Sequence, residues 1–99
     1  MGILEHGLYI GGKSIPTASA SEVLDPATNR VIARVAAGTR DDVGAAVDAA
    51  RDAFLSPEWR DLDPSKRGRL LWQLGQQVRD HFDELARLES LNVGKPLRE

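Results

Sequence analysis

Residues 23–54 read VLDPATNRVIARVAAGTRDDVGAAVDAARDAF and place a strand, a turn, a second strand and a helix in direct succession. The turn chemistry lies between Asp25 and Asn29, where Pro26 presets φ. Asn29 can adopt the left-handed conformation, which Asn tolerates better than most residues. Side chains then alternate in period 2 over residues 31–36, a pattern typical of a strand. Together with a short strand over residues 22–24, this segment predicts a β-hairpin.

The second part of the stretch predicts a helix over about residues 40–55. Thr39 is followed three residues later by Asp42, a pair that resembles a capping box with Asp in place of the preferred Glu. Apolar side chains then recur at helical spacing as far as Phe54, so one face of the helix is apolar.

The segment before residue 23 predicts another hairpin. In GLYIGGKSIP (residues 7–16), strand formers precede Gly11-Gly12, which can supply the positive φ angles of a two-residue turn. Lys13 to Ile15 would then return antiparallel, and the polar residues 17–21 would form a connector.

The segment after residue 55 predicts two more helices. SPEWRDLDP (residues 56–64) interrupts the helical pattern, and Asp63 is suited to cap a helix that has Pro64 at its first position. Leucine-rich stripes then predict helices over about residues 64–80 and 81–93, the last closed by Gly94. The order predicts an α+β fold with two short hairpins, within about residues 7–36, followed by about three helices.

Composition excludes several classes of function. The 99 residues contain no cysteine, so this chain offers no disulfide, thiolate ligand or Cys nucleophile. The net charge is −2 and no basic stripe is present, so no nucleic-acid partner is expected. The sequence has neither the pattern of a secretory signal nor an apolar run of roughly 18 residues, so we expect a cytoplasmic chain without a membrane partner.

Candidate catalytic and binding residues each have a simpler structural interpretation. His6 and His81 lack the spacing of a metal site, and surface positions explain them better. Asp61 and Asp63 could form an acid–base pair, but helix capping accounts for Asp63.

Two further candidates concern ligand pockets and phosphate binding. Trp59 and Trp72 could line a ligand pocket, although packing is the commoner role, with Trp59 filling a helix–helix junction. Gly94-Lys95 lacks the preceding glycine and the following Ser or Thr of a Walker motif. We therefore expect no catalytic, cofactor-binding or metal-binding residue in this chain.

Three motifs in order resemble the N-terminal segment of the NAD(P)-dependent aldehyde dehydrogenase superfamily. They are D-P-A-T-x-x-V-I at residues 25–32, D-V-x-x-A-V-x-A-A-R-x-A-F at residues 42–54, and the segment from R-G-R-L-L to L-E-S-L-N-V-G-K-P at residues 67–96. The similarity extends from about residue 8 to residue 99. Small departures are Asn29, where the family commonly has Gly, and Asn92-Val93, where Asp-Asn is frequent.

The resemblance implies an oxidoreductase that converts an aldehyde to a carboxylic acid with NAD or NADP. In the family a cysteine thiolate attacks the carbonyl, hydride passes to the nicotinamide, and a glutamate-activated water releases the acyl group. These residues all follow the point matched by Glu99, so none is transferred to this chain. The resemblance further implies an α/β Rossmann-like cofactor domain, of which residues 1–99 would be an incomplete part, and a homo-oligomeric enzyme.

Two hypotheses follow. In the first, the chain is an N-terminal fragment, inactive alone, whose partner is the remaining C-terminal part of an aldehyde dehydrogenase; Leu97 to Glu99 would begin a further helix. The apolar faces Val43/Val47/Phe54 and Leu70/Leu74/Val78 would then pack on residues that follow Glu99. The alternative is an independent α+β interaction or oligomerisation module derived from that family.

Overall fold

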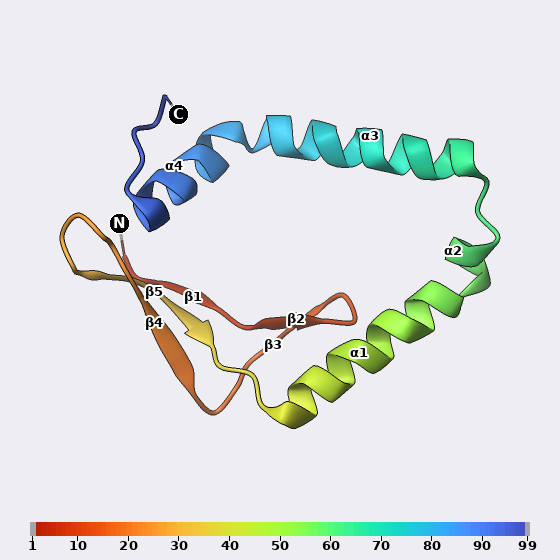
Figure 1. Ribbon diagram of the computed structural model, residues 1–99, viewed down its shortest axis with the longest axis horizontal. Helices are drawn as coiled ribbons and strands as arrows, with labels where there is room; N and C mark the ends of the chain where they lie inside the picture. The colour runs from red at the N-terminus through yellow and green to blue at the C-terminus, as the bar shows by residue number, and fades with distance from the viewer. Residues whose placement is uncertain (1, 99) are drawn as a thin grey trace.

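A three-stranded sheet organises the N-terminal part of the computed structural model, which describes residues 2–98 (Figure 1). The strands are β1 (Leu4–His6), β4 (Ala20–Leu24) and β5 (Val31–Ala36), in the order β1-β5-β4. β4 pairs antiparallel with β5, as the hairpin predicts, and β1 pairs parallel with β5 on its other side. Ala33 therefore lies between Leu4 and Val23 in the register.

Two tight turns have the backbone geometry that the sequence predicts. β2 (Leu8–Ile10) and β3 (Lys13–Ile15) form the antiparallel hairpin, with φ of +59° at Gly11 and +79° at Gly12. Asn29 has φ of +59°, and its N–H donates to the Asp25 carbonyl at 2.7 Å. Both positions need the left-handed region, which Gly and Asn reach at the lowest cost.

The structure corrects the strand assignment at two places. β1 was not predicted, because three residues are too short for periodicity and their partner β5 is about thirty residues away in sequence. β4 begins at Ala20, so the predicted connector over residues 17–21 ends two residues too late.

Four helices follow the strands: α1 (Arg40–Leu55), α2 (Pro57–Arg60), α3 (Pro64–Asp80) and α4 (Phe82–Val93). The capping box of α1 is confirmed. Thr39 Oγ1 accepts from the Asp42 N–H at 3.2 Å, and Asp42 Oδ2 accepts from the Thr39 N–H at 2.8 Å. The four-residue α2 was not predicted, because one turn is too short to show an apolar face.

The helix ends agree with the sequence except at Asp63. Gly94 closes α4 in the left-handed conformation with φ of +77°, as predicted. Asp63 occupies the N-cap position of α3, but its side chain makes no capping hydrogen bond, so its predicted capping role is wrong in that respect. Residues 97 and 98 form a turn, and residue 99 of the predicted further helix lies outside the described residues.

The elements form an open arrangement with little interior. The radius of gyration is 17.2 Å, whereas a compact domain of this length has about 13 Å. The accessible surface is 8369 Å², roughly 2,800 Å² above the value expected for a compact 10.8 kDa monomer. Within residues 2–98, Ala33 is the only buried hydrophobic residue, at 9% exposed. The fold is a small α+β structure that buries far less surface than its length allows.

The helices form an arc that leaves the sheet at α1 and returns toward it at α4 (Figure 1). α1 packs on α2 and on β2, and α3 packs on α4. The ribbon shows α3 on the side remote from the β2–β3 hairpin, joined to the rest of the molecule through its two ends. Along the described residues, no helix is both long enough and apolar enough to cross a membrane.

Candidate functional site

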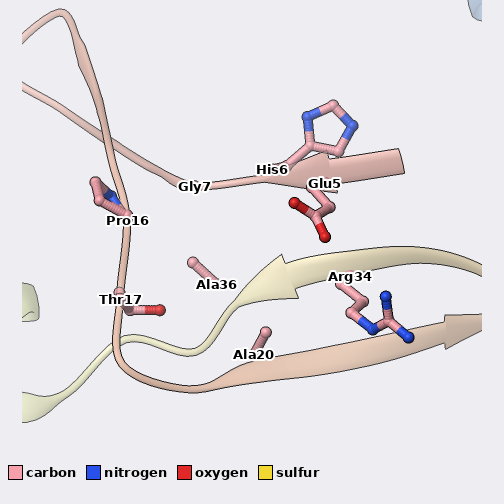
Figure 2. A pocket seen from close by; sticks show the side chains of 8 residues that line it. All are labelled: Glu5, His6, Gly7, Pro16, Thr17, Ala20, Arg34 and Ala36. Atoms are coloured by element: carbon pink, nitrogen blue, oxygen red, sulfur yellow. The ribbon is translucent and has the colours of Figure 1, made fainter. Parts of the chain in front are cut away.

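A shallow hollow of about 240 Å³ lies beside the sheet (Figure 2). Its polar walls come from Glu5 and His6 on β1, Thr17 before β4, and Arg34 on β5. Figure 2 shows Glu5 and His6 on opposite sides of their strand, as alternation in a strand requires. The Arg34 guanidinium lies 4.0 Å from Glu22, an exposed ion pair that contributes little to stability. These groups do not place a nucleophile next to a base.

The two histidines lie on different elements. His6 lines the hollow beside the sheet, whereas His81 stands at the junction of α3 and α4. The His81 Nδ1 atom is 2.8 Å from the Gln77 carbonyl, one helical turn earlier. The ring therefore contacts a backbone carbonyl in the last turn of α3. Over residues 2–98, the structure brings together no group of three or more His, Cys, Asp or Glu suited to a metal ion.

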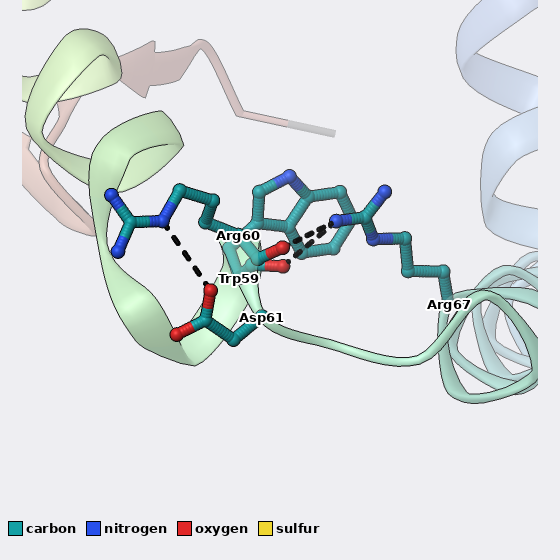
Figure 3. Close-up of polar contacts among 4 residues, drawn as sticks. All are labelled: Trp59, Arg60, Asp61 and Arg67. Atoms are coloured by element: carbon teal, nitrogen blue, oxygen red, sulfur yellow. Dashed lines mark hydrogen bonds and ion pairs between the residues drawn. The ribbon is translucent and has the colours of Figure 1, made fainter.

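The junction between α2 and α3 holds the most elaborate side-chain cluster (Figure 3). Arg67 Nη2 donates to the carbonyls of Trp59 at 3.0 Å and Arg60 at 3.2 Å. The same guanidinium lies over the Trp59 indole, 5.0 Å from its centroid, in a cation–π arrangement. Asp61 Oδ1 pairs with Arg60 Nε at 3.4 Å. This cluster connects the first turns of α3 to α2.

The two tryptophans differ in their surroundings. Trp59 lies at the helix–helix junction where the sequence places it, covered on one face by Arg67. Trp72 remains 65% exposed on α3, so the packing predicted for it does not occur among the described residues. Sequence reasoning missed Arg67, whose only signal was a basic residue on the first turns of the helix after Trp59.

The glycine-rich turn and the N-termini of α1 and α4 lack the features of a phosphate cradle. Phosphate cradles use backbone N–H groups at a helix N-terminus that follows a glycine-rich turn. Gly11 and Gly12 instead form a turn between two strands. The N-terminus of α1 has Asp41 and Asp42 in its first turn, and that of α4 has Asp83 and Glu84, so carboxylates occupy the positions where a phosphate would need positive potential.

α1 has two apolar faces with different surroundings. Small side chains, those of Ala46, Ala49 and Ala53, face the β2–β3 hairpin, and a Cβ placed on Gly11 would lie 3.9 Å from the Ala49 methyl. Val43, Val47 and Phe54 form a second stripe, because residues four and seven apart share a helix face. All three are more than half exposed. We call this set the α1 stripe.

α3 has a comparable exposed stripe. Three apolar residues follow one another at intervals of four positions: Leu70, Leu74 and Val78. Their exposed fractions lie between 47% and 60%. We call this set the α3 stripe. Both stripes were identified in the sequence as faces in need of a partner, and their exposure in the structure is confirmed. The candidate functional surface of this chain is thus apolar.

Comparison with known proteins defines the class to which this fold belongs. The sequence profile of the aldehyde dehydrogenase family matches residues 15–99. A phenylacetaldehyde dehydrogenase of Pseudomonas fluorescens is 42% identical over 96 residues, which cover 95% of this chain and 19% of that protein. A malonate-semialdehyde dehydrogenase of Geobacillus kaustophilus is 42% identical over 89 residues, which cover 88% of this chain and 18% of that protein.

Solved structures give the same result. An aldehyde dehydrogenase of Bacillus cereus, in an NAD⁺ complex, superposes with a TM-score of 0.90 at 35% identity, over 95% of this chain and 20% of that one. A betaine aldehyde dehydrogenase of Staphylococcus aureus, also with NAD⁺, superposes with a TM-score of 0.89 at 34% identity, over 96% of this chain and 20% of that one. The chain therefore belongs to the aldehyde dehydrogenase family. It spans about a fifth of the length of the relatives that it matches, consistent with an N-terminal segment.

Proposed function

We propose that this chain is a scaffold segment of an enzyme that oxidises an aldehyde to a carboxylic acid with NAD⁺ or NADP⁺. The observation that supports this proposal is the open structure, which superposes at a TM-score of 0.90 on a fifth of a dehydrogenase that binds NAD⁺. The segment would supply helices and strand pairs around the cofactor domain, whereas the reacting groups and the cofactor site would belong to the rest of the enzyme.

The same observations favour an inactive segment over an independent interaction module. An independent module of this length is expected to bury a core, because folding must offset the entropy of ordering the chain. Within the described residues that core consists of Ala33 alone. Homo-oligomeric assembly and a cytoplasmic location remain predictions.

The test compares this chain with a fusion. The chain alone, mixed with phenylacetaldehyde or betaine aldehyde and either nicotinamide cofactor, should produce no absorbance of reduced cofactor. The fusion joins the same 99 residues to the part of the Bacillus cereus enzyme that follows the matched segment. This fusion should produce the absorbance of reduced cofactor. Turnover by the chain alone, or an inactive but folded fusion, would contradict the proposal.

A further inference from the structure

The corner between α2 and α3 joins two arms of the helical part. α1 packs on α2 and α3 packs on α4, which gives an α1–α2 arm (residues 40–60) and an α3–α4 arm (residues 64–93). Figure 1 shows α2 at the bend where the chain turns from one arm to the other. Among the side-chain hydrogen bonds of residues 2–98, those donated by Arg67 are the ones that connect the two arms. Arg67 is therefore the cross-connection at this corner.

The sequence creates the need for this cross-connection. A one-turn helix such as α2 leaves the carbonyls at its C-terminus without intrahelical partners. In a continued helix the Arg60 carbonyl would accept from the N–H of residue 64, but that residue is Pro64 and has no N–H. Arg67 Nη2 donates to the Arg60 carbonyl at 3.2 Å and to the Trp59 carbonyl at 3.0 Å. A side chain from the first turns of α3 thus completes the C-terminus of α2.

More than these two hydrogen bonds holds the guanidinium of Arg67. The group lies 5.0 Å from the centroid of the Trp59 indole (Figure 3). Its Nε atom is buried without a hydrogen-bond partner, so this edge of the group is withdrawn from water, which strengthens a cation–π contact. Positive charge is also favourable at the C-terminus of a helix. A planar guanidinium can stack on the ring and donate to both carbonyls at once, whereas the ammonium of a lysine is a point charge.

We propose that Arg67 is an orientation clamp, which holds the α1–α2 arm at one angle to the α3–α4 arm and restrains residues 61–63 as a hinge. The donor belongs to one arm, and both acceptors and the stacked ring belong to the other. The Arg60–Asp61 ion pair adds little to the clamp, because both partners are more than half exposed and adjacent in sequence. All parts of the clamp lie within residues 59–67, so it does not depend on the proposed function.

The test measures the distance between two spin labels, one on each arm. Because the chain has no cysteine, Asp52→Cys on α1 and Gln73→Cys on α3, both at exposed positions, provide two specific labelling sites. Arg67→Lys keeps the charge but loses the fork of donors. It should broaden the distance distribution by about twofold or more, since a short linker without cross-contacts samples many orientations. Arg69→Lys, exposed on the same helix, is the matched control and should leave the width unchanged.

A second variant and a second measurement test the parts of the clamp separately. Trp59→Leu removes the ring but leaves both carbonyl acceptors, so it should broaden the distribution less than Arg67→Lys does. With Trp72→Phe in the background, Trp59 is the only tryptophan. Its near-ultraviolet circular dichroism band should then be lost with Arg67→Lys and kept with Arg69→Lys.

Two results would overturn the clamp. One is a broad distance distribution while Arg67 is intact, and the other is an equal width for Arg67→Lys and Arg69→Lys. Far-ultraviolet circular dichroism should show the same helix content in both lysine variants. A loss of helix in Arg67→Lys alone would contradict a role confined to orientation.

Discussion

The sheet and the α3 helix represent two different ways in which a segment is held in place. β5 has hydrogen-bonded partners on both sides, and its Ala33 is the one buried hydrophobic residue within residues 2–98. α3 is longer than any strand, yet its α3 stripe and Trp72 remain exposed. The strands form backbone hydrogen bonds with one another within the chain. α3 forms its backbone hydrogen bonds within itself and leaves its side chains uncovered.

This difference shows that a segment can adopt regular secondary structure without the side-chain packing of a stable tertiary structure. Most of the stability of helices in proteins comes from packing of an apolar face rather than from helix propensity. α3 has the apolar periodicity of a packed helix, with Pro64 at its first position, but not the packing. Substitutions in the sheet should therefore alter the stability of the isolated chain much more than substitutions on α3.

The largest effect is expected from Ala33→Asp. A carboxylate at this 9%-exposed position would be buried without a partner, at a cost of about 3–5 kcal/mol. Urea unfolding followed by circular dichroism, together with amide exchange in β4 and β5, should show loss of the sheet. Ser21→Asp, at an exposed position of β4, is the control and should change little; equal effects would remove the distinction between the two regions.

A smaller effect is expected where α4 meets the sheet turn. Gly94→Ala forces a Cβ into the left-handed region at φ of +77° and within 3.3 Å of Pro26 Cγ. The expected cost is about 1–2 kcal/mol. Gly75→Ala, inside α3 with open space around its Cβ, should instead stabilise the helix by roughly 0.5–1 kcal/mol. Chemical denaturation of the two variants should thus give shifts of opposite sign.

Thr39→Ala tests α1, which is packed on one side and exposed on the other. The substitution removes the hydrogen bond to the Asp42 N–H and should cost about 1 kcal/mol in urea unfolding. Asp63→Ala is the matched comparison, since the Asp63 side chain makes no cap hydrogen bond on α3. A larger loss for Asp63→Ala would contradict the assignment of the capping box.

The smallest effect is expected from Leu74→Ala. Truncating a buried leucine costs about 2–5 kcal/mol, but Leu74 is 60% exposed, so the free energy of unfolding of the isolated chain should change by less than ~0.5 kcal/mol. In the fusion to the Bacillus cereus enzyme, the same substitution should approach the cost for a buried leucine. If the cost of Leu74→Ala in the free energy of unfolding is no larger in the fusion than in the isolated chain, the α3 stripe has no partner there.

Local chemistry made much of the fold predictable. Pro26 and Asn29 define one turn, Gly11 and Gly12 another, and Thr39 with Asp42 defines the start of α1. These features depend on residues within a few positions of one another. The parallel pairing of β1 with β5 joins residues 29 apart, so no local pattern contains it. Which face of α1 packs on the hairpin likewise depends on distant residues.

The candidate surface was partly predictable for the same reason. The apolar stripes follow from helical periodicity, which a sequence displays directly. The Trp59–Arg67 cluster does not, because eight residues and a change of helix direction separate the two side chains. The expected absence of catalytic and cofactor-binding residues stays a prediction, supported by the acidic first turns of α1 and α4.

Amide hydrogen exchange, measured on the isolated chain and on the fusion to the Bacillus cereus enzyme, tests the central claim most directly. In the isolated chain, α3 amides should exchange much faster than those of β4 and β5, because local opening of α3 exposes little new surface. In the fusion, protection of α3 should rise by about a hundredfold or more as the α3 stripe is covered. If α3 is as protected in the isolated chain as in the fusion, the chain is not a segment whose helices depend on the rest of the enzyme.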